Sequence, residues 1–278
     1  MEKKQTTVPE PSLQEQFIQF SRKHLPDYLV RYLRYPIVFR TLNKLLCVSE
    51  ILELKEKLKD LSNFELVDAI VSYAGLTGKC ANREKIPPSG RLLIVANHPL
   101  GGADWLLIVQ CVRSFRSDIK VVINKDVNTL IENMRDLFIP VDTYAKFNDL
   151  AKKQIGESLE REEAVLLFPS GGISILTSRG VRDRKWKNGV VHFSRDHKTD
   201  ILPIYIGRRF RLIFYLYPIR LRRFLLVRNL LHSASHEVKL IIGDIVPHEE
   251  LEGDSDLSVI SARLRSITYN LAKLKEHS

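Results

Sequence analysis

The 278-residue chain carries 43 Lys and Arg against 33 Asp and Glu, a formal charge of +10, and 44% of its residues are hydrophobic, with 12 Phe and 9 Tyr. This composition excludes an intrinsically disordered chain, because such chains lack the apolar and aromatic content that offsets chain entropy. No repeat with a period of about 20 to 50 residues is present, which excludes a solenoid. The length suits one large domain or two small ones.

Neither a membrane-spanning helix nor a secretory signal is predicted. A spanning helix needs about 20 mostly apolar residues, and the uncharged run Ala164–Ser178 is interrupted by Pro169 and two glycines. The N-terminal lysines are followed by no apolar stretch. We therefore expect a cytoplasmic protein without a transmembrane helix.

The three cysteines, Cys47, Cys80 and Cys111, are odd in number and have no CxxC spacing. We predict reduced thiols, with neither a zinc site nor a disulfide framework.

Charge is unevenly distributed along the chain. The residues before Glu237 carry +13 and the remainder −3, and two stretches, Arg22–Lys44 and Arg208–Arg228, mix basic with apolar residues. The second holds seven arginines and no acid. Such a mixture is typical of contact with an anionic membrane surface, and Arg208–Arg228 is the preferred candidate. The alternative is helices packed on the core with a solvated basic face. No zinc-finger, RNP-like or basic-zipper pattern is present, so a nucleic-acid partner is not expected.

The chain divides into three predicted parts. Residues 1–11 are polar and are expected to be a disordered tail. Residues 12–84 read as an N-terminal helical lead-in, interrupted near Pro26 and Pro36. Ser62 and Glu65 have the spacing of a capping box, which predicts a helix start there. Residues 85–278 read as one α/β domain.

Short apolar runs alternate with helical patterns in residues 85–278. The predicted strands are Leu92–Ala96, Ile119–Ile123, Ala164–Phe168, Ile201–Ile206 and Val238–Ile242. The predicted helices are Asp104–Ser114, Asn128–Asp136, Phe147–Glu160, Asn188–Arg195, Ile219–Leu231 and Leu257–Leu274. Fully apolar strands alternating with helices predict a mostly buried mixed sheet flanked by helices, the α/β class.

The strand at Leu92–Ala96 runs into a polar, glycine-rich turn that contains Asn97, His98, Gly101 and Gly102 and ends at Asp104. Ligands bind at the carboxyl ends of strands in such sheets. A histidine can take a proton from a hydroxyl, and a nearby carboxylate fixes its tautomer. The alternative is that Asp104 merely caps the helix and His98 satisfies the turn.

A second turn of this kind follows the strand at Ala164–Phe168 and contains Ser170, Gly171 and Gly172. Backbone amides at such glycines can bind an anion or oxyanion. The alternative is a tight turn without further role. Two polar glycine turns after buried strands predict one shared cleft.

Four short blocks follow one another between about residues 85 and 250. They are Asn97-His98 with Asp104, Ile139-Pro140-Val141-Asp142, Phe168-Pro169-Ser170-Gly171-Gly172-Ile173-Ser174, and Ile201-Leu202-Pro203-Ile204-Tyr205. In these blocks the chain resembles the glycerolipid acyltransferases related to 1-acylglycerol-3-phosphate acyltransferase. The five residues between His98 and Asp104, where most members have four, resemble the branch of hemolysin-like and lyso-ornithine-lipid-type O-acyltransferases.

The resemblance implies an acyltransferase in which His98 is the general base and Asp104 orients it, with no metal and no bound cofactor. Acyl-CoA or acyl carrier protein (ACP) would supply the acyl group as a thioester. Members that use phosphate acceptors have Glu and Arg where this chain has Ser170 and Ile173. Since isoleucine cannot pair with a phosphate, lysophosphatidic acid becomes a doubtful acceptor.

Basic residues outside the blocks are further candidates. Arg182 and Arg184 belong to a loop with Arg179, Lys185 and Lys187, which we expect to recruit the phosphates or acidic surface of the donor. A solvated charged loop is the alternative. Lys125 and Arg135 flank the second block and are candidates for the acceptor's head group. The remaining histidines have no metal-like spacing.

The sequence thus predicts an O-acyltransferase on the cytoplasmic face of a membrane, acting on a lysolipid or a monoacylated amino-acid lipid. Alternatives are a catalytically silent lipid-binding protein and a 1-acylglycerol-3-phosphate acyltransferase proper. A lipid hydrolase with Ser170 as nucleophile is disfavoured, because Phe-Pro-Ser-Gly-Gly lacks the Gly-x-Ser-x-Gly elbow.

Overall fold

A computed structural model describes residues 14, 15, 18, 22, 27–125, 132–142, 149–217, 219–232, 236–253 and 256–273. The chain forms two compact units, Met1–Leu58 and Lys59–Ser278. The tail expected at residues 1–11 lies outside the described residues, and so does part of the helix expected at Asn128–Asp136.

The first unit is helical. Its helices are α2 (Asp27–Tyr32), α3 (Pro36–Leu46) and α4 (Val48–Lys57). Pro36 occupies the first turn of α3, where its missing N–H costs no hydrogen bond. Val30, Leu33 and Val48 form a small buried cluster that holds these helices together.

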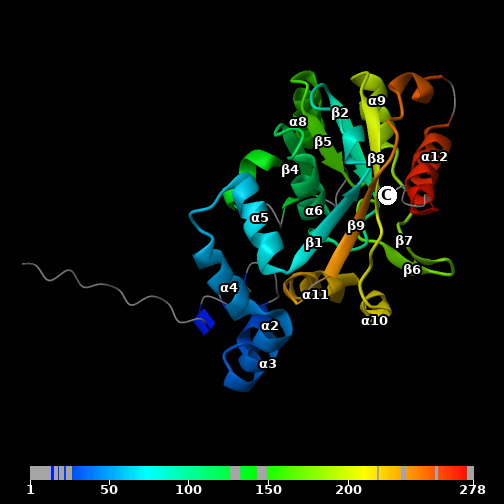
Figure 1. Ribbon diagram of the computed structural model, residues 1–278. Coiled ribbons are helices and arrows are strands. Elements are labelled where there is room, and N and C mark those ends of the chain that lie inside the picture. The colour runs from blue at the N-terminus through cyan, green and yellow to red at the C-terminus, as the bar shows by residue number, and fades with distance from the viewer. Residues whose placement is uncertain are drawn as a thin grey trace, which may run out of the picture. The chain divides into compact units, whose positions relative to one another are not determined.

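The second unit is built on a seven-stranded sheet (Figure 1). In chain order its strands are β1 (Leu76–Ala81), β2 (Leu92–Ala96), β3 (Ile119–Asn124), β4 (Phe138–Val141), β5 (Ala164–Leu167), β8 (Asp200–Ile206) and β9 (His236–Ile242). The order across the sheet is β1-β9-β8-β2-β5-β3-β4. All neighbours are parallel except β8 and β9, so β1 and β9 run opposite to the other five strands. A separate hairpin pairs β6 (Ile175–Thr177) with β7 (Gly180–Arg182).

Helices cover both faces of this sheet. The described helices of this unit are α5 (Asn63–Tyr73), α6 (Gly102–Val112), α8 (Asp149–Glu160), α9 (Gly189–Asp196), α10 (Leu212–Leu216), α11 (Ile219–Leu231) and α12 (Leu257–Asn270). Of these, α10 contacts β6 and α11 contacts α6. Short 3₁₀ helices cover Arg83–Lys85, Glu132–Leu137, His248–Leu251 and Leu271–Lys273. On one face, α8, α9 and α12 share a core with residues of β2, β4, β5 and β8. On the other face, α5 and α6 lie against β1, and α6 also contacts β3.

The predicted α/β class and mixed, buried sheet are confirmed. Every one of the five predicted strands is present, with bounds shifted by at most two residues. The sheet nevertheless begins before the expected boundary at residue 85, because β1 lies within the expected helical lead-in. The helix predicted after Ser62 is present as α5, although the Ser62 side chain makes no capping hydrogen bond.

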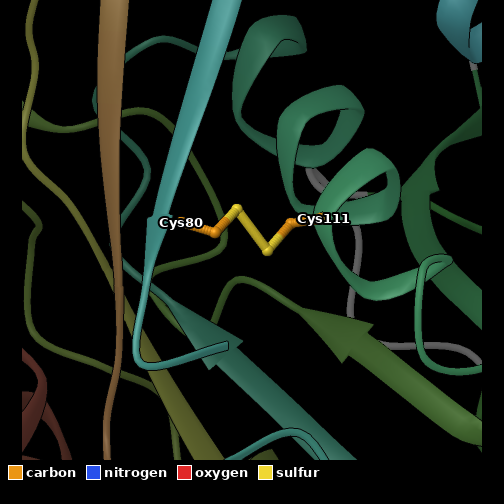
Figure 2. The surroundings of a disulfide bond; sticks show 2 residues. All are labelled: Cys80 and Cys111. Atoms are coloured by element: carbon orange, nitrogen blue, oxygen red, sulfur yellow. A yellow bond between two sulfur atoms is a disulfide. The ribbon is translucent and has the colours of Figure 1, made fainter. Parts of the chain in front are cut away.

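The structure contradicts the prediction that all three cysteines are reduced. A disulfide joins Cys80 in β1 to Cys111 in α6 (Figure 2), with the two Cα atoms 6.5 Å apart. The spacing of 31 residues gave no sign of this pairing. It arises because α6 packs across β1. Cys47 is buried in the first unit and outside the disulfide.

None of the described helices is both long enough and apolar enough to cross a membrane.

Candidate active site

The predicted site residues gather at one edge of the sheet. Strands β2, β3, β4, β5 and β8 run in the same direction, so their carboxyl ends share an edge. Asn97 and His98 follow β2 at this edge, and Phe168 follows β5. The backbone N–H of Ser174 donates to the carbonyl of His98 at 2.8 Å, which ties the two glycine turns together. The predicted shared location of the first and third blocks is therefore present.

His98 and Asp104 form a hydrogen-bonded pair across the first turn. Nδ1 of His98 lies 2.9 Å from Oδ2 of Asp104. The same carboxylate oxygen accepts the backbone N–H of Leu100 at 2.9 Å. The Asp104 side chain is fully buried, whereas that of His98 keeps 16% of its surface exposed. This arrangement fixes Nδ1 toward Asp104 and leaves Nε2, on the other side of the ring, available to a substrate.

Burial makes Asp104 an unusual carboxyl group. It raises the pKa of Asp104 from 3.8 to about 6, while the hydrogen bond from His98 and its charge oppose that rise. Oδ1 of Asp104 is also buried and accepts no hydrogen bond from any described residue. The carboxylate therefore depends on His98 and Leu100 for its stabilisation.

The turn between His98 and Asp104 needs glycine at one position. Gly101 has φ of +63°, a backbone conformation that L side chains rarely adopt. A Cβ there would lie 2.7 Å from Cδ2 of Leu226 on α11. Helix α11 therefore closes over this turn, at the start of α6.

Asn97 holds β2 to β8 just before the turn between His98 and Asp104. Its side-chain Oδ1 accepts the N–H of Ile206 at 2.7 Å, and its Nδ2 donates to the carbonyl of Ile206 at 3.0 Å. The residue is 3% exposed. These contacts give Asn97 a positioning role, and the substrate contact predicted for it stays a prediction.

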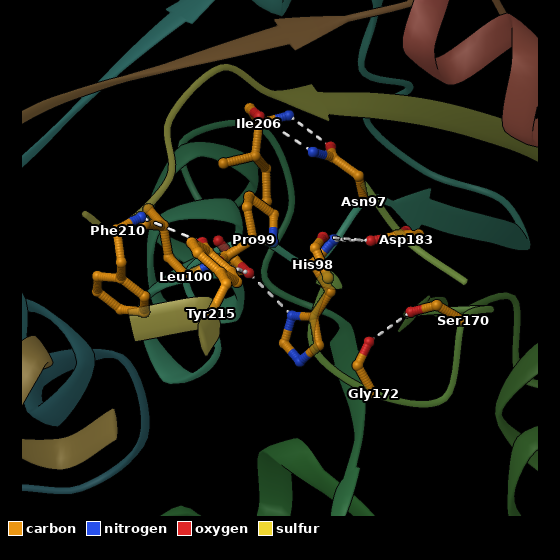
Figure 3. Close-up of polar contacts among 12 residues, drawn as sticks. Asn97, His98, Pro99, Leu100, Ser170, Gly172, Asp183, Ile206, Phe210 and Tyr215 are labelled. Carbon is orange, nitrogen blue, oxygen red and sulfur yellow. Dashed lines mark hydrogen bonds and ion pairs between the residues drawn. The ribbon is translucent and has the colours of Figure 1, made fainter. Parts of the chain in front are cut away.

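The second glycine turn is closed by two internal hydrogen bonds. Oγ of Ser170 donates to the carbonyl of Gly172 at 2.7 Å, and the backbone N–H of Gly171 donates to the carbonyl of Phe168 at 2.9 Å. The ring of Phe168 stacks on that of His98, with centroids 4.0 Å apart. The imidazole and the Ser170–Gly172 turn accordingly lie side by side (Figure 3). The Ser170 hydroxyl is thus used within the turn, which does not suit it as a nucleophile.

Asp183 is a site residue that the sequence analysis missed. Its Oδ1 accepts the backbone N–H of His98 at 3.1 Å and Oγ of Ser174 at 2.5 Å, and its Oδ2 accepts Nε1 of Trp186 at 2.9 Å. Its own N–H donates to the hydroxyl of Tyr269 at 2.8 Å. Asp183 is 2% exposed. Its only sequence signal is a lone acid, three residues before a tryptophan, within a basic loop.

The predicted basic ligands occupy different places. The guanidinium of Arg182 lies 4.9 Å from the centre of the Tyr269 ring. Together with Arg179, Arg208 and Arg209, Arg182 lines an open pocket of about 500 Å³ beside Asn97 and Pro99. Arg184 is exposed and does not line it. Lys125 follows β3 at the same sheet edge, where its Nζ lies 2.6 Å from Oδ2 of Asp142.

The stretch Arg208–Arg228 is divided between surface and core. Phe214 and Tyr215 of α10 are buried, whereas the neighbouring apolar side chains are 40–68% exposed: Leu212, Ile213, Leu216 and Tyr217. Arg209 and Arg211 beside them are exposed. In α11, by contrast, Arg222 and Leu225 are buried. The hydroxyl of Tyr215 donates to the carbonyl of Pro99 at 2.8 Å, which joins α10 to the catalytic turn (Figure 3).

One group of possible metal ligands lies away from this edge. Asp200, His248 and Glu249 bring ligand atoms within 4.8 Å of one another at the amino end of β8. Nδ1 of His248 is already 2.9 Å from Oδ1 of Asp200. A paired, partly exposed set of this kind does not amount to a metal site.

The geometry suits proton abstraction by an oriented histidine. A buried carboxylate sets the tautomer, Asp183 and Ser174 fix the histidine backbone, and Phe168 fixes the ring plane. Nδ1 is engaged, so Nε2 is the nitrogen that can accept a proton from a bound hydroxyl.

Comparisons with known proteins identify the family of the chain. Residues 13–232 match the acyltransferase family. The lyso-glycine lipid O-acyltransferases of Bacteroides thetaiotaomicron and Phocaeicola vulgatus are each 24% identical to the chain, over 194 and 197 residues. These alignments cover 69% of this chain and 68% and 66% of the relatives, so the chain spans about two thirds of their length. The crystal structure of the LPA acyltransferase PlsC from Thermotoga maritima aligns with a TM-score of 0.49 at 16% identity, over 95% of this chain and 89% of that chain. The family match covers well over half of the sequence and includes the His98 and Ser170 turns, so the chain belongs to the acyltransferase family and is an enzyme that transfers acyl groups.

Proposed function

We propose that the protein transfers an acyl chain from a thioester donor, acyl-CoA or acyl-ACP, to the hydroxyl of a lysolipid or a monoacylated amino-acid lipid. His98 takes the hydroxyl proton on Nε2, and the resulting alkoxide attacks the thioester carbonyl. Asp104 keeps Nδ1 protonated and stabilises the imidazolium. The proposal rests on one observation above all, the 2.9 Å contact between Nδ1 of His98 and the buried carboxylate of Asp104.

The C–S bond of the tetrahedral intermediate then breaks, the thiolate leaves, and the proton on Nε2 of His98 passes to the thiolate, so no acyl-enzyme is needed. One base and one oxyanion site then suffice. The backbone N–H of Gly172, beside the His98 ring, is our candidate for the oxyanion site, because the N–H of Gly171 already donates to the carbonyl of Phe168. The internal hydrogen bond of Ser170 to Gly172 supports direct transfer rather than an acyl-serine.

A lipid acceptor is supported by the two O-acyltransferase relatives, whose names specify a lyso-glycine lipid. Glycine has no hydroxyl of its own. An O-acyl acceptor built on glycine must therefore carry its hydroxyl on the amide-linked acyl chain. We take such an N-(hydroxyacyl)glycine as the first acceptor to assay, with lysophosphatidic acid as the second.

The pocket lined by Arg179, Arg182, Arg208 and Arg209 is our candidate for the donor. Coenzyme A and the prosthetic arm of ACP both carry phosphates, which arginine pairs with well. Arg182→Glu should raise the KM for acyl-CoA or acyl-ACP at low salt. Lys185→Glu, an exposed residue of the same loop that does not line the pocket, is the control. Equal effects of the two changes would contradict the assignment.

Membrane attachment is proposed through α10. Its exposed Leu212, Ile213 and Leu216 would enter the apolar layer, while Arg209 and Arg211 meet anionic head groups. We expect Leu216→Asp to reduce flotation with anionic vesicles. Leu150→Asp is a matched control, because Leu150 on α8 is 63% exposed against 68% for Leu216. If neither Leu216→Asp nor the anionic lipid content changed the fraction of protein that floats, α10 would be excluded as the membrane-binding surface.

The function itself is tested by incubating the purified protein with donor, vesicles and each acceptor, and by detecting the O-acylated product by mass spectrometry. The intact protein is weighed in the same reaction with donor alone. We expect product and no acylated protein. An acyl group on Ser170, or a Ser170→Ala variant without activity but with normal folding, would favour the covalent alternative.

A further inference from the structure

Helix α11, which closes over the turn between His98 and Asp104, carries a buried arginine with no counter-ion among the described residues. Arg222 is 8% exposed, and its buried Nε has no hydrogen-bond partner in the described part of the chain. Within the described residues, no carboxylate lies at ion-pair distance from it. Burying a guanidinium is costly unless an anion pairs with it. The buried guanidinium of Arg222 would therefore be stabilised by a bound anion.

The position of Arg222 follows from helical spacing. Arg222, Leu226 and Leu230 are separated by four residues each, so they share one face of α11. Cδ2 of Leu226 lies 2.7 Å from the place where a Cβ on Gly101 would be, and Cδ2 of Leu230 lies 3.9 Å from that place on Gly102. The face that carries Arg222 thus covers the turn between His98 and Asp104.

A second guanidinium acts on Arg222. Burial and the positive charge of Arg184 lower the pKa of Arg222, and the Tyr215 side chain opposes this shift. Arginine nevertheless stays charged in proteins. The two like charges repel, and an anion bound at Arg222 would offset this repulsion and pair the buried Nε–H.

We infer that Arg222 binds the carboxylate of the acceptor lipid, and so holds that lipid with its hydroxyl at His98. This inference rests on the proposed function and specifies its acceptor. A glycine acylated on nitrogen keeps one free carboxylate, the planar partner that guanidinium groups bind in a bidentate manner. The donor's phosphates are a poorer fit, because Arg222 is absent from the residues that line the arginine-rich pocket.

The apolar neighbours suit an anchored lipid. Ile173, like Leu226, reaches the Gly101 turn, with its Cδ1 3.4 Å from the place of a Cβ there. The carboxylate would sit at Arg222 while the acyl chain follows these apolar side chains. A neutral head group would leave Arg222 buried and unpaired, so the site would discriminate against it.

The kinetic test compares three acceptors in neutral detergent micelles: an N-(β-hydroxyacyl)glycine, its methyl ester, and lysophosphatidic acid. Arg222→Met should raise the KM for the free acid about 10- to 100-fold, the usual weight of a charge-assisted contact, and leave transfer to the ester unchanged. Arg83→Met is the matched control, because Arg83 is exposed and follows β1, a strand that runs opposite to β2. Equal losses with acid and ester, or a loss confined to lysophosphatidic acid, would overturn the carboxylate assignment.

A binding experiment separates this inference from the proposed activity. An N-acylglycine without a hydroxyl cannot be acylated, so its affinity for the wild-type protein reports the head-group site alone. We expect Arg222→Met to weaken binding about tenfold or more, and Arg222→Lys to weaken it less. Arg222-dependent binding without any transfer would support the site and refute the activity. Acyl transfer by a protein whose affinity for the N-acylglycine does not change in Arg222→Met would support the activity and refute the carboxylate site.

Discussion

The carboxylate of Asp183 accepts the backbone N–H of His98 at 3.1 Å, although 85 residues separate the two in sequence. The same oxygen accepts the Ser174 hydroxyl, and the other oxygen accepts the Trp186 indole. The buried side chain of Asp183 thus fixes three segments relative to one another: the turn that begins at His98, the end of the second glycine turn at Ser174, and the loop that contains Trp186.

Replacing this acceptor should loosen the site. Asn has only one acceptor oxygen, so in Asp183→Asn an amide N–H must face a donor from either His98 and Ser174 or Trp186. We expect the free energy of unfolding to fall by about 1–3 kcal/mol, the cost of a buried unsatisfied donor, and kcat to fall more than KM rises. Thermal melts and steady-state kinetics measure both. Asp196→Asn, at an exposed residue of α9, is the control, and a decrease of the same size there would remove the special role of Asp183.

The free energy of unfolding should depend on pH because of the raised pKa of Asp104. Its pKa is about 6 in the folded protein against 3.8 as the ordinary value, so between these values the folded state binds more protons than the unfolded state. Stability attributable to Asp104 is then present below about pH 4 and is lost as the pH rises to about 6, on the order of 3 kcal/mol for a shift of this size. Chemical denaturation of wild type and Asp104→Asn across this range tests it. Parallel curves for the two proteins would contradict the assignment.

The rate should follow the opposite trend in the same pH range. Only the ionised Asp104 can hold Nδ1–H and stabilise the imidazolium, so we expect kcat/KM to rise as the pH increases through about 6. In Asp104→Asn the neutral amide can orient His98 but not stabilise its charge. Its rate should be lower by about 10²- to 10⁴-fold, and the part of the rise near pH 6 that comes from the ionisation of Asp104 should be missing. The pH–rate profiles of the wild type and Asp104→Asn test this. An inflection near pH 6 that is the same in both proteins would belong to a group other than Asp104.

Gly101 should tolerate no side chain. Gly101→Ala combines a φ of +63° with a Cβ 2.7 Å from Leu226, so we expect a loss of stability of about 1–3 kcal/mol and a drop in activity from displacement of α11. Gly189→Ala is the matched control, because a Cβ on Gly189 meets nothing within 4 Å and its φ is not positive. Comparable melting temperatures for the two variants would show that α11 does not depend on this turn.

The sequence predicted those parts of the fold that buried apolar runs specify. β2 is LLIVA and is buried at every position, so composition alone identified it. β1 was missed because LTGKCA has one buried residue and two exposed ones, Thr77 and Lys79, and because its pairing with β9 is a contact over about 160 residues. The three-residue strands β6 and β7 are too short to produce a periodic pattern.

The candidate site was predictable where a motif encodes it. His98, Asp104 and the two glycine turns were identified from local spacing and from the resemblance. Asp183, Trp186 and Arg222 were not, because their roles depend on which face of a helix or loop the tertiary fold turns inward. The arginine-rich stretch was expected to lie on a membrane, yet Arg222 within it is buried.

The proposed function depends above all on Nε2 of His98 being the base for the acceptor hydroxyl. The most direct measurement is the single-turnover rate of acyl transfer by His98→Ala, with His192→Ala at an exposed position as the control. We predict a loss of about 10²- to 10⁴-fold for His98→Ala, with a cooperative melting transition that shows the variant to be folded, and near-normal transfer by His192→Ala. Turnover by a folded His98→Ala protein at the wild-type rate would contradict the role of His98 as the base.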